Sequence, residues 1–266
     1  MSDPRPIGVF DSGLGGLTVV RALRQALPQE SILYLGDTAR VPYGNKSATA
    51  VQSYSRQISE YLVGYDAKMI IVACNTASAL ALDVLQTEWS LPVVGVIEPG
   101  VETALAATEN NHIGIIGTIA TIRSGAYQAQ LQLRRANLLL RATPCPLFVP
   151  LVEEGWLDGP IVEAVAEKYL ADINASSVDT LILGCTHYPL LKPVLQQVVK
   201  PGTTLVDSAT AIVGKIAEIL KTRHLSADDG ETGSFTCMVT DLPAQFETIA
   251  GRFLGTAAPQ VEHVRL

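Results

Sequence analysis

The same short pattern occurs at two places in the chain, and it limits the choice of fold more than any other part of the sequence. The two segments are residues 69–76 (MIIVACNT) and 180–187 (TLILGCTH). In each, an apolar run rich in β-branched residues leads to a small residue, a cysteine and two polar residues. Helical apolar spacing follows, so the pattern predicts a strand, a sharp turn and a helix. Because open α/β sheets bind ligands outside the carboxyl ends of their strands, we expect Cys74 and Cys185 at such edges.

Further similarities between the two halves indicate an internal duplication. The strand expected at residues 113–116 follows the one expected at residues 7–10 by 113 − 7 = 106 residues. The two cysteines are 185 − 74 = 111 residues apart, and Asp207 follows Glu98 by 207 − 98 = 109. One such similarity could arise by chance, but three in the same order do not. We therefore expect an α/β fold of two pseudo-symmetric domains, each a mostly parallel sheet flanked by helices, with the active site in the interdomain cleft.

The end of the chain is too short to form a third unit. It contains an amphipathic segment, predicted to be a helix over residues 209–220, and two short predicted strands, 235–240 and 261–264. We expect these to return to the first domain, and we expect Glu98–Gly100 to be the crossing into the second. The expected domains are residues 1–97 plus 208–266, carrying Cys74, and residues 98–207, carrying Cys185.

The composition excludes several classes of protein. The chain has 266 residues, of which 48% are hydrophobic and 17% charged, as in globular proteins that bury a core. No apolar run approaches the roughly 18 residues that cross a membrane, so we expect no membrane partner. A net charge of −7 without a Lys/Arg cluster argues against nucleic acid. The amino-terminus lacks the pattern of a signal peptide, so we expect a cytoplasmic protein.

The four cysteines are far apart and form no CxxC pair, which favours free thiols over disulfides or a metal site. A buried cysteine at a strand end is more often a small core residue than a catalytic group. The duplication and the polar residues that follow Cys74 and Cys185 favour function for these two. Cys145 and Cys237 lack that setting and are expected to be structural.

A glycine-rich turn at residues 11–16 follows the first expected strand. A dinucleotide-binding turn needs glycine where Thr18 stands, and a P-loop needs a lysine before its Ser or Thr. Since neither is present, we expect the glycines to allow close approach to a small ligand or tight helix packing.

Two thiols that face one ligand suit racemisation. A cysteine at a helix amino-terminus can have a lowered pKa, because the free N–H groups and the helix dipole favour the thiolate. One thiolate would remove a proton from the α-carbon while the opposite thiol supplies one, which inverts the configuration. Asp11, in the turn near the first cysteine, and His187, two residues after the second, are placed to assist.

Several motifs resemble those of the glutamate racemases in the cofactor-independent aspartate/glutamate racemase superfamily. They are residues 8–16, 37–44, 73–78, 184–189 and 206–208. This resemblance implies two α/β domains with the active site between them. It also implies interconversion of L- and D-glutamate without pyridoxal phosphate, metal or nucleotide, a supply of D-glutamate for peptidoglycan, and a homodimer.

The resemblance also assigns site residues, each by its place in a matching motif. The catalytic groups are Cys74, Cys185, Asp11, His187 and Glu153, although Glu154 beside the last leaves its register open. The substrate-binding residues are Asp11, Ser12, Pro42, Tyr43, Gly44, Asn75, Thr76, Thr186 and His187. By the internal repeat, Thr118 corresponds to Ser12 and joins them, as does Thr121.

Other functions remain open from the sequence. The chain could racemise another acidic amino acid or a hydantoin, because pocket contacts that set specificity are not visible in a sequence. It could be a redox sensor that forms a Cys74–Cys185 disulfide, or a silent binding module. Lysine-dependent pyridoxal chemistry is disfavoured, because no lysine lies at a strand-to-turn junction in either repeat.

Overall fold

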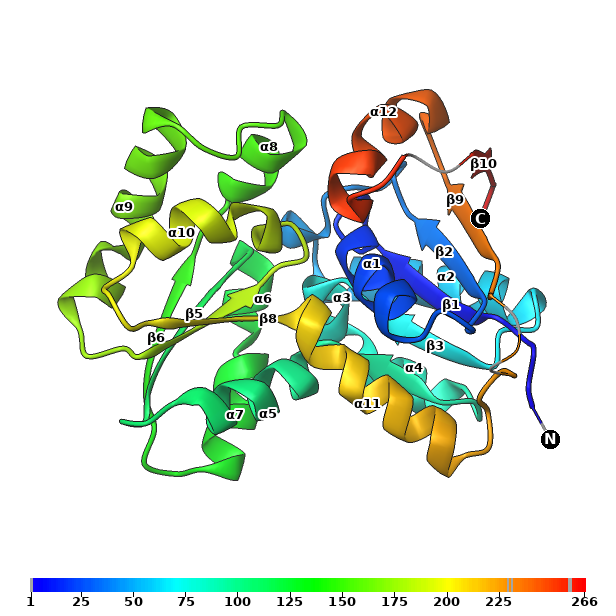
Figure 1. Ribbon diagram of the computed structural model, residues 1–266, viewed down its shortest axis with the longest axis horizontal. Coiled ribbons are helices and arrows are strands. Elements are labelled where there is room, and N and C mark those ends of the chain that lie inside the picture. The colour runs from blue at the N-terminus through cyan, green and yellow to red at the C-terminus, as the bar shows by residue number, and fades with distance from the viewer. Residues whose placement is uncertain (1, 229, 231, 258–259) are drawn as a thin grey trace.

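The strands form two parallel sheets, one in each half of the molecule (Figure 1). The structure, a computed structural model, describes residues 2–228, 230, 232–257 and 260–266. Over these residues the larger sheet contains β1 (Ile7–Asp11), β2 (Ile32–Gly36), β3 (Met69–Val72), β4 (Val93–Gly95), β9 (Phe235–Val239) and β10 (Val261–His263). The smaller sheet contains β5 (His112–Gly117), β6 (Leu139–Pro144), β7 (Thr180–Gly184) and β8 (Thr204–Asp207).

Helices connect these strands and cover the sheets. In the amino-terminal part they are α1 (Leu17–Ala26), the 3₁₀ turn η1 (Tyr43–Asn45), α2 (Ala48–Gly64), α3 (Asn75–Leu80) and α4 (Leu82–Glu88). In the second half they are α5 (Ile97–Ala107), α6 (Ile119–Ser124), α7 (Ala126–Arg134), α8 (Phe148–Glu153), α9 (Pro160–Ala175), the 3₁₀ turn η2 (Tyr188–Leu191) and α10 (Lys192–Val198). The chain then returns to the first half through α11 (Ser208–Thr222) and α12 (Pro243–Leu254).

The two sheets share one strand order, which agrees with the internal duplication. The larger sheet runs β10-β9-β2-β1-β3-β4 and the smaller runs β6-β5-β7-β8, and the paired strands are parallel. The order β2-β1-β3-β4 therefore corresponds to β6-β5-β7-β8. The expected α/β class, with two mostly parallel sheets flanked by helices, is confirmed. The boundaries at residues 97 and 208 stay a prediction.

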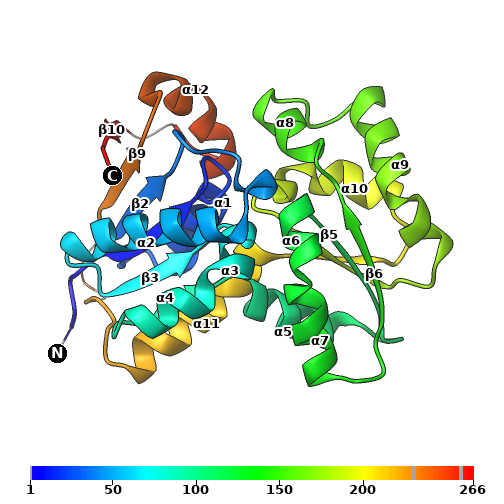
Figure 2. The ribbon, with the colours of Figure 1, turned by 180° about the vertical axis from the view of Figure 1, so that it is seen from behind.

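The cysteine strands are buried on both faces, as their unbroken apolar sequences require in a parallel sheet. In the larger sheet, α1, α11 and α12 cover the face seen in Figure 1, and α2, α3 and α4 cover the face seen in Figure 2. In β3, Met69 and Ile71 join the core on one face while Ile70 and Val72 join the core on the other. Because side chains alternate between the two faces of a strand, this pattern sets the orientation in which the residues after β3 leave the sheet.

The expected crossing at Glu98–Gly100 lies in the first turn of α5, where Pro99 is tolerated because the first N–H groups of a helix have no partner within it. As a domain boundary it stays a prediction. In addition, α12 forms between the two strands that were predicted to close the chain. Its signals were present, since Pro243 begins it and Gly255, at φ 68°, follows its end.

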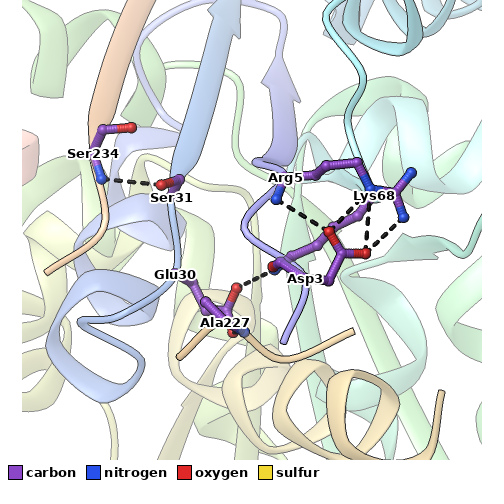
Figure 3. A network of polar contacts seen from close by, with 7 residues as sticks. All are labelled: Asp3, Arg5, Glu30, Ser31, Lys68, Ala227 and Ser234. Carbon is purple, nitrogen blue, oxygen red and sulfur yellow. Dashed lines mark hydrogen bonds and ion pairs between the residues drawn. The ribbon is translucent and has the colours of Figure 1, made fainter. Parts of the chain in front are cut away.

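A buried ion pair joins four segments on the side of the larger sheet far from the cysteines (Figure 3). Lys68 Nζ donates to Glu30 Oε2 at 2.5 Å and to the Asp3 carbonyl at 2.8 Å, and both charged side chains are at most 1% exposed. Glu30 Oε1 also accepts from the N–H of Ala227 at 2.9 Å. The pair therefore ties the amino-terminal segment and the segment after α11 to the starts of β2 and β3.

Candidate active site

A cavity of about 440 Å³ opens between the two halves, within the size range of small-molecule sites. Residues from both halves line it, and most of the residues predicted from the sequence are among them. The predicted residues are Ser12, Pro42, Tyr43, Gly44, Cys74, Asn75, Thr76, Thr118, Glu153, Cys185, Thr186 and His187. The residues not predicted are Val41, Asn45, Ile119, Pro146, Val149 and Pro150. These are mostly apolar. Val149 and Pro150 lie in α8, Ile119 begins α6 and Asn45 ends η1, so they reach the cavity only through the packing of these elements against the cysteine turns.

Cys74 lies where β3 ends and α3 begins, as predicted. It is the N-cap residue of α3, and its Sγ accepts a hydrogen bond from the N–H of Ala77 at 3.5 Å. The thiol also contacts Ser12 Oγ at 3.8 Å, and the residue is 5% exposed. The helix start and the glycine-rich turn thus hold this sulfur at the cavity wall.

The pKa of Cys74 differs from the expectation of a lowered value. Burial raises the pKa of this thiol to about 12, and the nearby Asp11 carboxylate adds to the rise. The contacts of the sulfur with the Ala77 N–H and the Ser12 hydroxyl act in the opposite direction but are outweighed. The prediction was wrong because it considered the helix terminus without the loss of solvation. In the free protein Cys74 is therefore a thiol.

Cys185 follows β7 in the same way as Cys74 follows β3, and it is also 5% exposed. Its local structure differs, because the 3₁₀ turn η2 comes before α10 where a helix was predicted directly. Pro189 and Pro193 near the starts of these two elements lack the N–H groups that a continuous helix needs. The side chain that contacts the Cys185 sulfur is His187, with its Nδ1 at 3.9 Å.

His187 links Cys185 to a carboxylate. Its Nε2 lies 3.0 Å from Glu153 Oε1 at the end of α8, and it is the 153 rather than the 154 side chain that makes this contact. Burial disfavours the imidazolium, yet the contacts with Cys185 and Glu153 raise the pKa of His187 to about 10. The Phe253 ring, from α12, packs nearly perpendicular to the imidazole with centroids 5.3 Å apart. The cation of His187 stabilises negative charge on the Cys185 sulfur.

Asp11 lies behind the cavity wall rather than in it. Its Oδ2 accepts from the N–H of Gly13 at 3.0 Å and its Oδ1 from the hydroxyl of Thr186 at 3.3 Å, and it is 1% exposed. Burial raises the pKa of this carboxyl, while the cation of His187 opposes the rise. Asp11 thus joins the glycine-rich turn of the first half to the second cysteine turn, and it is not among the residues that line the cavity in the described part of the chain.

A second buried carboxylate, Asp37, holds the loop that contains the Pro-Tyr-Gly motif. It accepts hydrogen bonds from the Tyr43 hydroxyl, from Arg40 Nε at 2.7 Å and from the Thr240 hydroxyl at 2.9 Å. The sequence motif at residues 37–44 gave no role to Asp37. This aspartate lies three residues before Arg40, and its role depends on its burial, which the sequence does not show.

Three threonine hydroxyls bridge the two halves beside the first cysteine turn. Thr76 Oγ1 is 3.0 Å from Thr118 Oγ1 and 3.2 Å from Thr121 Oγ1, and the last two are 2.9 Å apart. Thr118 also caps α6 by accepting from the N–H of Thr121. Thr76 and Thr118 line the cavity, whereas Thr121 lies directly behind them.

The charges at the cavity are few. Among its lining residues in the described structure there is no lysine or arginine, and Glu153 and His187 carry its ionisable charge besides the thiols. Over the same described residues, no group of three or more His, Cys, Asp and Glu side chains is arranged to hold a metal ion. A ligand carboxylate would therefore be bound by hydroxyls, amides, backbone N–H groups and the His187 cation.

This arrangement suits proton transfer at two faces of one ligand. The two sulfurs come from equivalent strands of two similarly built sheets and border one cavity. Each has polar support of a different kind: Ser12 and the start of α3 for Cys74, and the His187–Glu153 pair for Cys185. A two-base exchange requires one thiol and one thiolate, and the two sulfurs have unlike surroundings.

The chain is similar to known proteins over nearly its whole length. The family described as Asp/Glu/Hydantoin racemase matches residues 8–216. A glutamate racemase of Chlorobaculum tepidum is 48% identical over 265 residues, which are 99% of this chain and 97% of that protein. The glutamate racemase of Francisella tularensis in complex with D-glutamate is 39% identical with a TM-score of 0.92, covering 99% of this chain and 98% of that one. The Escherichia coli enzyme in complex with L-glutamate and the activator UDP-MurNAc-Ala is 27% identical with a TM-score of 0.80, covering 99% and 100%.

Proposed function

Because this chain belongs to the Asp/Glu/Hydantoin racemase family, we propose that it is a glutamate racemase that interconverts L- and D-glutamate by proton transfer between two cysteines. The observation that carries this mechanism is the pair of cysteines at equivalent strand ends, both bordering one cavity. The relatives whose structures contain D-glutamate or L-glutamate support the choice of substrate.

In the proposed reaction the α-hydrogen of bound glutamate passes as a proton to one thiolate sulfur, and its electron pair stays on the α-carbon. The opposite thiol then gives its proton to the other face of that carbon, so thiol and thiolate exchange roles. His187 stabilises the charge on Cys185, and Glu153 stabilises the imidazolium. Asp11 acts through the turns that it holds together.

In this proposal, neutral hydrogen-bond donors of the cavity wall bind the substrate. The hydroxyls of Ser12, Thr76 and Thr118, the Asn75 amide and the Tyr43–Gly44 turn line the cavity that both sulfurs border. The Thr186 hydroxyl instead donates to Asp11 behind the cavity wall. Hydrogen bonds to a carboxylate are stronger than bonds between neutral groups, so several such donors can replace an arginine.

The direct test follows the optical signal of L-glutamate and of D-glutamate with the purified protein, without added pyridoxal phosphate or metal. Both should decay to zero rotation, because enantiomers have equal free energy. In D₂O the product should carry deuterium at the α-carbon from either side. A protein that leaves both glutamate enantiomers unchanged, or that racemises aspartate or a hydantoin instead, would refute the assignment.

The biological setting is also part of the proposal. We propose that the protein works in the cytoplasm without a cofactor, supplies D-glutamate for peptidoglycan and forms a homodimer. In the described part of the chain, no helix has the length and apolar character needed to span a bilayer. Sedimentation velocity at micromolar concentration tests the dimer, and a single monomer peak would contradict it.

Replacing Glu153 by glutamine should move the alkaline limit of activity to lower pH. The contacts with Cys185 and Glu153 raise the pKa of His187 to about 10, so the imidazolium persists until about that pH. Without the Glu153 charge its pKa falls, and the loss of kcat/KM on raising the pH begins earlier. The measurement is the pH profile of kcat/KM for wild type and variant on the same substrate.

Glu154→Gln is the matched control, because the neighbouring carboxylate is exposed and does not contact His187. Its profile should coincide with that of wild type. If Glu154→Gln shifted the alkaline limit of kcat/KM while Glu153→Gln did not, the proposed role of Glu153 in stabilising the His187 imidazolium would be wrong.

A further inference from the structure

Tyr127, in the first turn of α7, contacts both cysteine turns from beneath the cavity. Its hydroxyl donates to Asn75 Oδ1 at 2.6 Å, and Asn75 is the residue after Cys74. Its ring packs on Gly184, the residue before Cys185, so closely that a Cβ there would lie 3.0 Å from ring carbon Cε2. The side chain is fully buried and does not line the cavity in the described structure. One residue thus touches the neighbours of both sulfurs.

The direction of the hydrogen bond follows from the groups involved. Among the hydrogen bonds of the described residues, the bond to Asn75 is the one that the Tyr127 hydroxyl makes. Burial raises the pKa of this phenol far above its usual range, so it keeps its proton. A hydroxyl with one partner must use its proton there, and only the amide oxygen can accept it.

The orientation of Asn75 is therefore set from outside the cavity. With Oδ1 held by Tyr127, the amide NH₂ is directed to the other side, where one N–H reaches Ser208 Oγ at 3.3 Å. The second N–H makes no hydrogen bond within the described residues, and Asn75 is one of the residues that line the cavity. If the amide were reversed, its oxygen would face a bound carboxylate, which repels it.

The orientation of the Asn75 amide affects substrate binding because the cavity wall has no arginine or lysine among the residues described. Each neutral donor therefore contributes to carboxylate binding. Tyr127 and Asn75 also come from different halves of the molecule, α7 and α3. The contact consequently forms only when the two halves are in the arrangement that brings the cysteine turns together.

We propose that Tyr127 is a positioning residue that holds the Asn75 amide as a donor to the substrate's carboxylate and joins that amide to the strand end carrying Cys185. The proposal rests on the glutamate racemase activity proposed above. Tyr127 does not touch the substrate, and it acts through Asn75.

The test is Tyr127→Phe, which keeps the ring against Gly184 and removes the hydroxyl. We expect KM for both glutamate enantiomers to rise about tenfold, the loss of about one hydrogen bond to a charged group, with kcat changed by less than about twofold. In an Asn75→Ala background the same substitution should leave KM unchanged, because the group on which Tyr127 acts is gone. An unchanged KM in the single variant, or equal effects in both backgrounds, would overturn the proposal.

Tyr188→Phe is the matched control. Tyr188 is equally buried, and its hydroxyl donates to the Cys145 carbonyl at 2.8 Å, away from Asn75. It should lower the melting temperature as much as Tyr127→Phe but show no coupling to Asn75→Ala. If it couples equally, the effect of Tyr127 is general loosening and the proposal fails. An inactive wild type would instead refute the racemase assignment, whereas an active wild type with an unaffected Tyr127→Phe variant refutes the role of Tyr127 alone.

Discussion

Replacement of Cys74 or Cys185 by serine should lower kcat for racemisation by about 10²–10⁴-fold, the contribution of a positioned acid or base. A hydroxyl is a much weaker acid than a thiol, so serine cannot serve as the base at neutral pH. Since both cysteines are small and border the cavity, the fold should be retained. Far-UV circular dichroism would check the fold, and the optical assay would check the rate.

Hydrogen exchange makes this prediction more specific. A variant with one remaining thiol can still remove the α-proton from the face that this thiol addresses and return a deuteron to the same face. In D₂O each variant should therefore exchange the α-hydrogen of one glutamate enantiomer and not of the other, with the preference reversed between Cys74→Ser and Cys185→Ser. Exchange of both enantiomers by one variant would mean that a single base serves both faces.

Cys237→Ala is the control for these variants. Cys237 is 1% exposed in β9 and does not border the cavity among the described residues. It should cost some stability, about 1 kcal/mol as for an average substitution, and leave kcat unchanged. A loss of racemisation equal to that of Cys74→Ser would show that the assay reports stability and not chemistry.

Replacement of Glu30 by glutamine should reduce the free energy of unfolding by about 3–5 kcal/mol, because it leaves the Lys68 ammonium buried without a counter-charge. The pair is 2.5 Å apart and at most 1% exposed, and it joins the amino-terminal segment, β2, β3 and the segment after α11 (Figure 3). Such a loss is a large part of the stability of a typical domain. Urea denaturation followed by tryptophan fluorescence would measure it.

Two further variants test whether the loss of stability comes from the unpaired Lys68 charge or from the removal of any ion pair. Glu88→Gln breaks the exposed pair with Arg56 and should cost at most about 1 kcal/mol, because water solvates both groups. Replacing Glu30 and Lys68 together by leucine and methionine should be milder than Glu30→Gln alone, since no unpaired charge remains. A double variant as unstable as the single one would show that the hydrogen bonds to Asp3 and Ala227 matter more than the charge.

Much of the architecture could be predicted because it is recorded locally along the chain. The unbroken apolar runs at residues 69–72 and 180–184 are typical of strands buried on both faces, and each is followed by a turn. The repeated offsets indicate two similar units, and the shared strand order agrees with them. The helix α12 was not predicted, although Pro243 at its start and Gly255 after its end are helix start and stop signals in the sequence.

The site could be predicted less completely. The residues next to the two cysteines were found through their motifs, and the structure brings most of them to one cavity. Asp11 and Thr121 lie behind that cavity, and Asp37 and Tyr127 were not singled out at all. These four share one property: each contacts a side chain of the cavity wall and does not line the cavity in the described structure, and no local pattern in the sequence shows such a contact.

The sequence alone was sufficient to predict two parallel α/β units and to mark the strand ends at which the two thiols lie. Hydrophobic periodicity and turn-forming residues act between residues that are close in the chain, so the sequence shows them directly. The protonation of Cys74, the cation at His187 and the orientation of Asn75 depend on folding in three dimensions. Burial withdraws water from Cys74, and Glu153 and Tyr127 reach their partners across 34 and 52 residues of chain. Electrostatics and hydrogen bonding depend on distance in space, which the sequence does not contain.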